Sequence, residues 1–221
     1  LPYEKVGNNE PICIAEEVPF EIPVSWEWVR LGSILKVKGG KRLPKEHNLT
    51  DVPTNHIYIR VTDMKNHTIY SDKLKYITES TYQLIKNYII NKEDLYLTIA
   101  GTIGNIGIVP DKFDGMNLTE NAVKLTDIRI NKYYLLHIIC SNYIQNKFVD
   151  KTNKVAQPKL AIERILTTLL PLPPIEEQQR IVDKIKELEP YIKEYDVAYE
   201  KIEKLNNNFP DQLKKSILQE A

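Results

Sequence analysis

The C-terminal part of the chain carries apolar residues at a heptad spacing, which only a small class of structures can accommodate. Over residues 181–202 the intervals between these residues alternate between four and three. This repeat places them along one side of an α-helix, where a second helix must cover them. The positions of this seam are Ile181, Ile185, Leu188, Ile192, Tyr195, Tyr199 and Ile202. The sequence therefore predicts a dimerising coiled-coil helix over residues 173–207.

Local signals predict how this helix begins and ends. Glu176 and Glu177 follow a proline-rich stretch, and acidic side chains favour the first turn of a helix. Pro190 lies within the seam, where it predicts a kink or a local break. An asparagine run at 206–208 ends the heptad pattern, and residues 208–221 have the spacing of a short second helix.

The residues before this helix predict an α+β domain. Residues 1–18 are polar and lack periodicity, which indicates an N-terminal linker. Within residues 19–172, runs rich in β-branched and aromatic residues predict short strands, for example at 57–61 and 95–99. Residues 80–86 and 132–149 have helical spacing. We therefore expect a bent, mainly antiparallel sheet with short helices, followed by the coiled-coil helix.

The charge of the chain is unevenly distributed. The formal net charge is zero, but residues 19–172 contain 21 Lys and Arg against 15 Asp and Glu, and both flanking segments are acidic. A polyanion responds to the surface that it contacts rather than to the total charge. The basic central domain is therefore compatible with nucleic acid binding.

Cysteine content and hydropathy restrict the setting in which the chain works. Cys13 and Cys140 lie far apart, which argues against a disulfide framework and favours a reduced, cytoplasmic setting. No apolar run is long enough to span a membrane, and the first residues lack the pattern of a signal peptide. The chain begins with Leu1 rather than methionine, which is typical of a piece of a longer protein.

A dense group of cations marks residues 36–45 as a candidate phosphate-binding loop. It contains Lys36, Lys38, Lys41, Arg42 and Lys45 and no acidic residue. Two adjacent glycines in the same segment would let the backbone approach a ligand closely. The alternative is a basic loop that is simply solvated.

Further polar loops supply groups that could contact bases. The run 99–107 has the pattern G-x-x-G-x-x-G, which differs from a dinucleotide fingerprint and favours a tight β-loop. Asn121 and Gln157, in the loops 117–121 and 151–159, carry amides that match adenine edges. Asp63 and Glu120 could accept a hydrogen bond from the cytosine amino group, or could serve as turn or cap residues.

Motifs for catalysis or metal binding are not found in the sequence. The histidines lack the spacing of a metal site, and no N-P-P-[FY] methyltransferase motif or defensible nuclease cluster is present. The four histidines are His47, His56, His67 and His137. The sequence therefore predicts a binding protein without catalytic residues or a metal.

Several blocks of the sequence resemble those of one known family. The segments 22–32, 91–104, 170–182 and 209–221 are similar, in order and spacing, to blocks of type I restriction-modification specificity subunits. The segment that ends in the E-Q-x-R-I pattern at Glu177–Ile181 is the most specific of them. The resemblance covers nearly the whole chain, as a single target-recognition domain with a conserved helix.

The resemblance implies a function for each part. In this family each target-recognition domain reads one half of a bipartite double-stranded DNA target, and the helices set the gap between the halves. Modification subunits carry S-adenosylmethionine and methylate adenine, restriction subunits cleave, and the specificity subunit itself needs no cofactor. A single domain with one long helix would be a half-length subunit or a fragment, whose seam pairs with a second copy or with another specificity half.

Two alternatives remain open from the sequence. The chain could be the DNA-recognition fragment of a fused restriction-modification enzyme, or a coiled-coil interaction module without a role on DNA. For the main interpretation, we expect the cations, amides and hydroxyls of the polar loops to border the DNA. The candidate DNA-binding residues are Lys38, Lys41, Arg42, Lys45, Arg60, Thr102, Asn105, Asn121, Lys154, Gln157 and Lys159.

Overall fold

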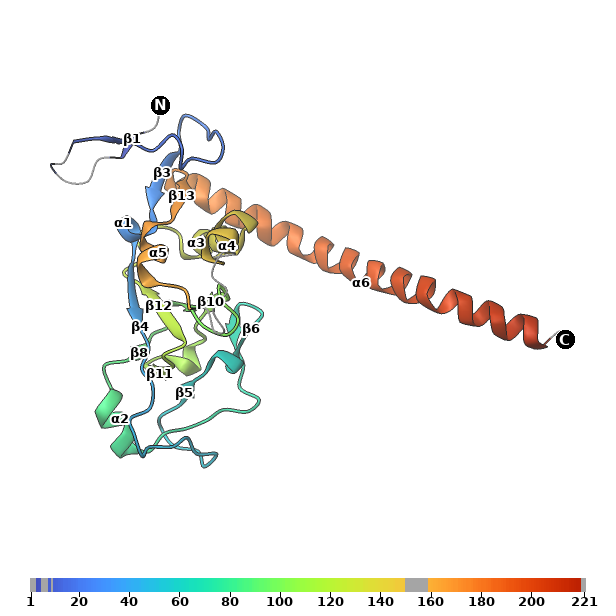
Figure 1. The fold of residues 1–221 in the computed structure, drawn as a ribbon, viewed down its shortest axis with the longest axis horizontal. Helices are drawn as coiled ribbons and strands as arrows, with labels where there is room; N and C mark the ends of the chain where they lie inside the picture. The colour runs from blue at the N-terminus through green and yellow to red at the C-terminus, as the bar shows by residue number, and fades with distance from the viewer. Residues whose placement is uncertain (1–2, 5–7, 9, 150–158, 220–221) are drawn as a thin grey trace. The chain divides into compact units, whose positions relative to one another are not determined.

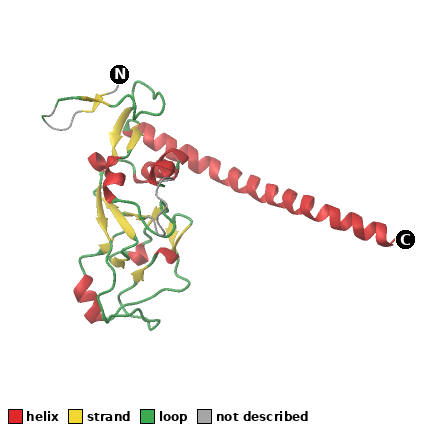
Figure 2. Ribbon diagram, viewed as in Figure 1, coloured by secondary structure: helices red, strands yellow, loops and turns green. Residues whose placement is uncertain are grey.

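A computed structural model describes residues 3–4, 8, 10–149 and 159–219, with secondary structure alone for 208–219 (Figure 1). The chain divides into two compact units, Leu1–Gln178 and Gln179–Ala221. In the first unit, short strands and helices alternate with long loops (Figure 2). Its architecture confirms the prediction of an α+β fold with mainly antiparallel pairing.

A four-stranded antiparallel sheet forms the centre of the first unit. Its order is β10-β9-β12-β4. The strands are β4 (Lys36–Gly39), β9 (Leu95–Thr98), β10 (Ile106–Ile108) and β12 (Ala122–Thr126). Alternate residues such as Val37, Leu97 and Leu125 point to one face, where they join the main hydrophobic core.

Short helices cover this face of the sheet. They are α1 (Leu31–Ile34), α3 (Lys132–Cys140), α4 (Asn142–Phe148) and α5 (Ile162–Thr167), and most of their buried residues belong to the same core. The segment 132–149 was predicted as one helical stretch, but it forms two helices. Ser141 separates them, because its backbone is extended and its hydroxyl accepts a hydrogen bond from the Ile144 N–H.

The opposite face of the sheet packs on a second core. Tyr96 and Ala122 contact this core from the four-stranded sheet. A three-stranded sheet, of order β5-β11-β8, completes it together with a two-stranded hairpin. These strands are β5 (Tyr58–Ile59), β8 (Ile89–Ile90), β11 (Met116–Leu118), β6 (Met64–Lys65) and β7 (Thr68–Ile69). Only the β5–β11 pair among the described ladders is parallel.

The remaining elements lie at the two ends of the first unit (Figure 1). One end holds the pairs β1 (Tyr3–Glu4) with β2 (Ile12–Cys13), and β3 (Glu27–Arg30) with β13 (Leu169–Leu172). The other end holds α2 (Glu79–Ile85), close to the predicted helix 80–86. Arg30 forms ion pairs of 2.8 Å with Glu4 and Glu17, so the predicted linker 1–18 makes specific contacts with the domain. Short 3-10 turns at Val61–Asp63 and Asp111–Phe113 connect strands.

The second unit is formed by the long helix α6 (Ile175–Gln219), which begins in the first. Of the kink or local break predicted at Pro190, the break does not occur, because a proline removes one backbone hydrogen bond while the turns on both sides stay helical. The helix also continues through the asparagine run to Gln219, so residues 208–219 do not form the separate helix that was expected over 208–221. The seam residues from Leu188 to Ile202 are between 43% and 67% exposed.

Two further findings concern membranes and cysteines. No helix in the described part of the chain is long and apolar enough to cross a membrane. Cys13 and Cys140 are both free thiols, the first exposed and the second partly buried.

Candidate nucleic-acid interface

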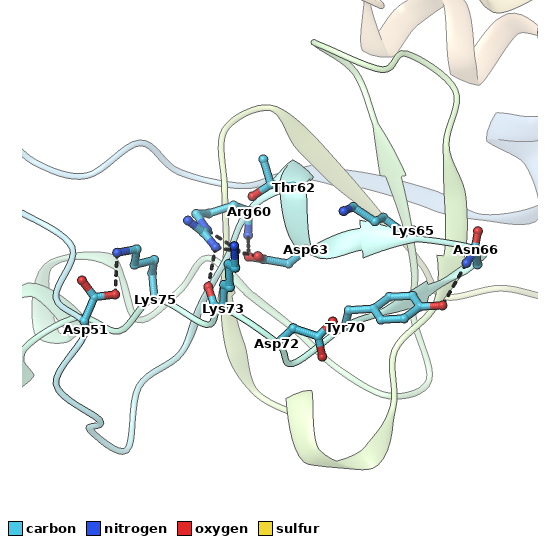
Figure 3. Close-up of a pocket in the computed structure, with 10 residues that line it drawn as sticks. All are labelled: Asp51, Arg60, Thr62, Asp63, Lys65, Asn66, Tyr70, Asp72, Lys73 and Lys75. Carbon is cyan, nitrogen blue, oxygen red and sulfur yellow. Dashed lines mark hydrogen bonds and ion pairs between the residues drawn. The ribbon is translucent and has the colours of Figure 1, made fainter.

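Two hollows adjoin on the first unit and share Arg60 and Thr62 in their linings. We call the larger one, of about 830 Å³, the Asp63 hollow, and the smaller one, of about 400 Å³, the Glu120 hollow. The Asp63 hollow is lined by Asp51, Arg60, Thr62, Asp63, Lys65, Asn66, Tyr70, Asp72, Lys73 and Lys75 (Figure 3). The Glu120 hollow is lined by Arg42, Leu43, Tyr58, Arg60, Val61, Thr62, Thr119, Glu120 and Asn121.

An ion pair between the partly buried Arg60 and the buried Asp63 lies in the wall of the Asp63 hollow. The Arg60 guanidinium donates to both carboxylate oxygens of Asp63, at 3.1 Å from Nε and 2.7 Å from Nη2 (Figure 3). Asp63 is 6% exposed and also accepts from the backbone N–H of Arg60 at 2.9 Å. Both oxygens are therefore occupied, and the structure favours the turn-or-cap role of Asp63 over direct contact with a base.

Unpaired cations lie around this ion pair. Lys75 pairs with Asp51 at 2.5 Å, whereas Lys65 and Lys73 are exposed and form no ion pair with any residue that the structure describes. The backbone oxygen of Lys73 accepts a 2.7 Å hydrogen bond from Arg60, which holds this segment beside the hollow. Such free ammonium groups are suited to phosphate oxygens.

Sequence reasoning did not identify Lys65 and Lys73 as candidates. Lys65 precedes a two-residue turn in which Asn66 and His67 have φ values of 47° and 59°. Positive φ at both central residues is the geometry of a tight hairpin. The sequence shows Asn-His here rather than the usual Asn-Gly, so the hairpin signal is weak. Asparagine and histidine are nevertheless among the non-glycine residues that adopt positive φ most often.

A partly buried carboxylate occupies the Glu120 hollow. Arg42 donates from Nε to Oε1 of Glu120 at 2.8 Å. On the other carboxylate oxygen, the Thr119 hydroxyl donates at 3.0 Å and the Tyr58 hydroxyl lies at 3.4 Å. Tyr58 also donates to the backbone oxygen of Lys41 at 2.7 Å, which connects the strand β5 to the segment after β4.

The environment changes the pKa of two groups in this hollow. Burial acts to raise the pKa of Glu120, but hydrogen bonds from Arg42, from its own backbone N–H and from Thr119 outweigh burial and lower it. Burial, as the main cause, raises the pKa of Tyr58 to about 12. At neutral pH Glu120 is therefore ionised and Tyr58 is a neutral hydrogen-bond donor.

Hydrogen bonds and close packing bring polar loops to the Glu120 hollow. The Asn121 oxygen accepts from the N–H groups of Ile99 and Ala100, at 2.8 and 3.2 Å. The ammonium group of Lys159 donates to the Glu120 backbone oxygen at 3.2 Å. The loop of Gly101 also lies beside the hollow, because a Cβ placed on Gly101 would be 3.8 Å from a methyl group of Val61 in the lining. The exposed Thr102 follows Gly101 in this loop.

The predicted DNA-binding residues divide into those near the hollows and those elsewhere. Arg42, Arg60 and Asn121 line the Glu120 hollow, and Lys159 and Thr102 lie on adjacent loops. Asn105 is near Met64, but its amide donates to the Met64 backbone oxygen at 2.9 Å and is already engaged. Lys154 and Gln157 lie outside the described residues.

The basic segment 36–45 does not form the predicted single loop, because its first half is the strand β4. Lys38 is exposed on this strand opposite Lys124, and the Lys41 ammonium lies 5.3 Å from the centre of the Tyr88 ring. Lys45 is exposed in a turn before Glu46, which has a φ of 69°. None of these three lysines lines either hollow, in contrast to the neighbouring Arg42.

The glycines of this segment also differ from the expectation. A Cβ on Gly40 would collide with the backbone oxygens of Leu118 and Thr119, whereas a Cβ on Gly39 meets no atom within 4 Å. Gly40 also donates its N–H to the oxygen of Ala122 at 3.1 Å. The close approach at Gly40 is therefore to the chain itself rather than to a ligand.

The histidines have partners within the domain. The His56 ring stacks on Tyr82 with centres 3.9 Å apart and approaches Glu79 at 2.6 Å. His47 contacts the Thr81 hydroxyl at 2.8 Å. Among the residues that the structure describes, no three His, Cys, Asp or Glu side chains group together as a metal site would require.

The chain combines a basic α+β domain that carries polar hollows with a long helix that exposes an apolar seam, which is the class of a small recognition domain with an appended helix. The chain belongs to the family of the type I restriction modification DNA specificity domain, whose family model matches residues 23–207. The prediction of a type I specificity subunit with a single recognition domain is therefore confirmed.

Individual relatives agree with this assignment. The chain is 27% identical over 172 residues to the EcoBI specificity subunit of Escherichia coli, covering 77% of this chain and 36% of the relative. It is 27% identical over 196 residues to the EcoAI specificity subunit of the same organism, covering 83% and 32%. The HsdS subunit from Thermoanaerobacter tengcongensis has a similar structure, with a TM-score of 0.59, 26% identity and coverage of 84% and 47%. The chain thus spans about a third of the length of these curated relatives.

Proposed function

We propose that this chain reads one half of a bipartite double-stranded DNA target and directs methylation and restriction by partner subunits. The observation that carries this proposal is the gathering of guanidinium, ammonium, amide and hydroxyl groups around two adjoining hollows of a specificity domain. Base edges are read by such groups in the major groove, and phosphates are bound by cations beside them.

The two hollows suggest a division of roles. Lys65 and Lys73 carry free ammonium groups and are suited to the phosphate backbone, with Lys159 at the edge of the second hollow. Arg42 and Asn121, in the Glu120 hollow, are suited to base edges. Phosphate contacts would fix the register of the domain, and the base contacts would select the sequence.

The partners follow from the family. Modification subunits would supply S-adenosylmethionine and the methyl transfer, and restriction subunits would supply cleavage, while this chain would add no cofactor or catalytic residue. The exposed seam of α6 would pair with a second copy or with another specificity half. The complex would act on DNA in the cytoplasm. In this proposal residues 19–172 form the recognition domain and residues 173–207 the pairing part of the helix.

A salt series on single variants tests where DNA lies. The chain is assembled with its modification subunits, and binding to cognate and scrambled duplexes is measured as the salt concentration rises. Lys65→Ala and Lys73→Ala should each weaken binding to both duplexes and lower the slope of log affinity against log salt by roughly one. Lys112→Ala is the matched control, because Lys112 is exposed but lines neither hollow.

The same series includes Lys41→Ala and Lys45→Ala. A reduced salt slope for Lys41→Ala and Lys45→Ala, with an unchanged slope for Lys65→Ala and Lys73→Ala, would place the DNA beside Lys41 and Lys45 rather than at the hollows. An assembled complex that shows no salt-dependent binding to any duplex would contradict the proposal and favour a coiled-coil interaction module.

A further inference from the structure

We propose that Arg42 reads a guanine and that Glu120 is a positioning residue that holds the arginine for this contact. The inference rests on the proposed function and deepens it, because it assigns one base of the half-site to one side chain. It replaces the expectation that Glu120 itself reads a base.

The Glu120 carboxylate is a fixed support. Its side chain is 23% exposed, and its two oxygens accept from different neighbours. Oε1 accepts from Arg42, while Oε2 accepts from Thr119 and lies 3.4 Å from the Tyr58 hydroxyl. Both carboxylate oxygens are already engaged, so a cytosine amino group would have to compete with these neighbours for the lone pairs that remain.

Arg42 has the opposite character. Its side chain is 80% exposed, although its Nε is held at 2.8 Å from Glu120. The terminal Nη1 and Nη2 groups form no hydrogen bond with any residue that the structure describes. The guanidinium is planar, so fixing Nε also restricts the direction in which the two terminal nitrogens point.

Two parallel donors match one base in particular. In the major groove guanine presents two adjacent acceptors, O6 and N7, whereas adenine pairs its N7 acceptor with an amino donor. An arginine held at Nε still offers Nη1 and Nη2 for this bidentate contact. The ion pair also reduces the entropy that the arginine loses on binding, because fewer of its rotamers are available beforehand.

Arginine variants test the base assignment. The chain, assembled with its modification subunits, selects from a duplex library randomised across the half-site, and the bound sequences are counted. Arg42→Ala should reduce the preference for guanine at one position by roughly 5- to 150-fold, the range of a single bidentate base contact. Arg42→Lys should lose most of that preference as well, although it keeps the charge. Arg129→Ala, an exposed arginine that lines neither hollow, should leave the selected motif unchanged.

Glu120 variants test the positioning role. Glu120→Gln keeps an oxygen that can accept from Nε of Arg42 and should retain most of the guanine preference. Glu120→Ala should lose part of the preference at the same position as Arg42→Ala, and the double variant should lose no more than Arg42→Ala alone. A merely structural role would instead weaken all positions of the motif together.

Three results would overturn the inference. Arg42→Ala could weaken every sequence equally, which would make Arg42 a phosphate contact. Glu120→Gln could change the selected base while Arg42→Ala leaves that position intact, which would make Glu120 the reader. The wild-type motif could also lack a G·C pair at any position that depends on Arg42. A wild-type complex without any sequence preference would be a different result, because it would contradict the proposed function itself.

Discussion

The proposed pairing of α6 through its exposed seam predicts that Ile192→Asp prevents the chain from pairing with a second copy. Ile192 lies midway along the seam and is 56% exposed in the single chain. In an antiparallel two-fold pair the midpoint residue of one helix approaches its own copy in the other. The substitution therefore removes an apolar contact from both helices and places two negative charges near each other.

The magnitude follows from the exposed fraction. Complete burial of an isoleucine side chain contributes about 1.5–3 kcal/mol, so burying the exposed half contributes about 1–1.5 kcal/mol per chain and about 2–3 kcal/mol per dimer. Two aspartates about 6 Å apart at an effective dielectric constant of about 20 repel by about 3 kcal/mol. The sum of about 5 kcal/mol corresponds to a dissociation constant raised by more than about a thousandfold.

Light scattering and sedimentation at micromolar concentration measure the effect. Val197→Asp is the matched control, because Val197 is 53% exposed on the same helix but lies off the seam. Ile192→Lys should also give monomers, and an equimolar mixture of the Asp and Lys variants should restore a heterodimer. A wild-type chain that stays monomeric, or an Ile192→Asp variant that still dimerises, would refute the reasoning.

Three further predictions concern the domain. Asp63→Asn should lower the free energy of unfolding by about 2 kcal/mol in urea titrations, since it removes the charge of a buried carboxylate that pairs with the partly buried Arg60. Asp72→Asn, at an exposed position of the same hollow, should have little effect. Gly40→Ala should destabilise the fold and weaken DNA binding, whereas Gly39→Ala should be tolerated; equal effects in thermal melts would contradict the close approach described above. The fold lowers the pKa of Glu120, so the ionised carboxylate stabilises the folded state fully at pH values above the ordinary pKa of 4.5. This stabilisation is lost as the pH falls through the lowered pKa of the folded state. The difference in unfolding free energy between wild type and Glu120→Gln should therefore be constant between about pH 6 and 8 and shrink in acid.

The fold class and the long helix could be predicted because they depend on local patterns. The heptad seam of residues 181–202 and the strand run Leu95–Thr98 are periodic, and periodicity reports which face is buried. The continuity of the helix past Pro190 could not be predicted in this way. A proline specifies the loss of one hydrogen bond, but not whether the surrounding turns stay helical.

The candidate site was only partly predictable, because it depends on pairings between distant segments. Arg42 and Glu120 are far apart in the sequence, and no composition signal links them, yet they meet in one hollow. Lys41 is adjacent to Arg42 in the same basic segment, yet its ammonium lies over the Tyr88 ring. A cluster of cations in the sequence therefore indicates charge, whereas the tertiary structure determines the direction in which each cation points.

The arginines and the lysines of the hollows would contribute differently to non-specific and to sequence-specific DNA binding. Both arginines that line the hollows are neutralised by carboxylates, while Lys65 and Lys73 stay free. Only the free cations add the sequence-independent attraction that displaces counterions from DNA. The paired arginines add little to that attraction, but their fixed guanidinium groups can still match a base edge. A domain built in this way would bind non-specific DNA weakly and gain most of its affinity at the matching half-site. In a genome with a large excess of competing sites, the ratio of specific to non-specific affinity matters more than the specific affinity alone.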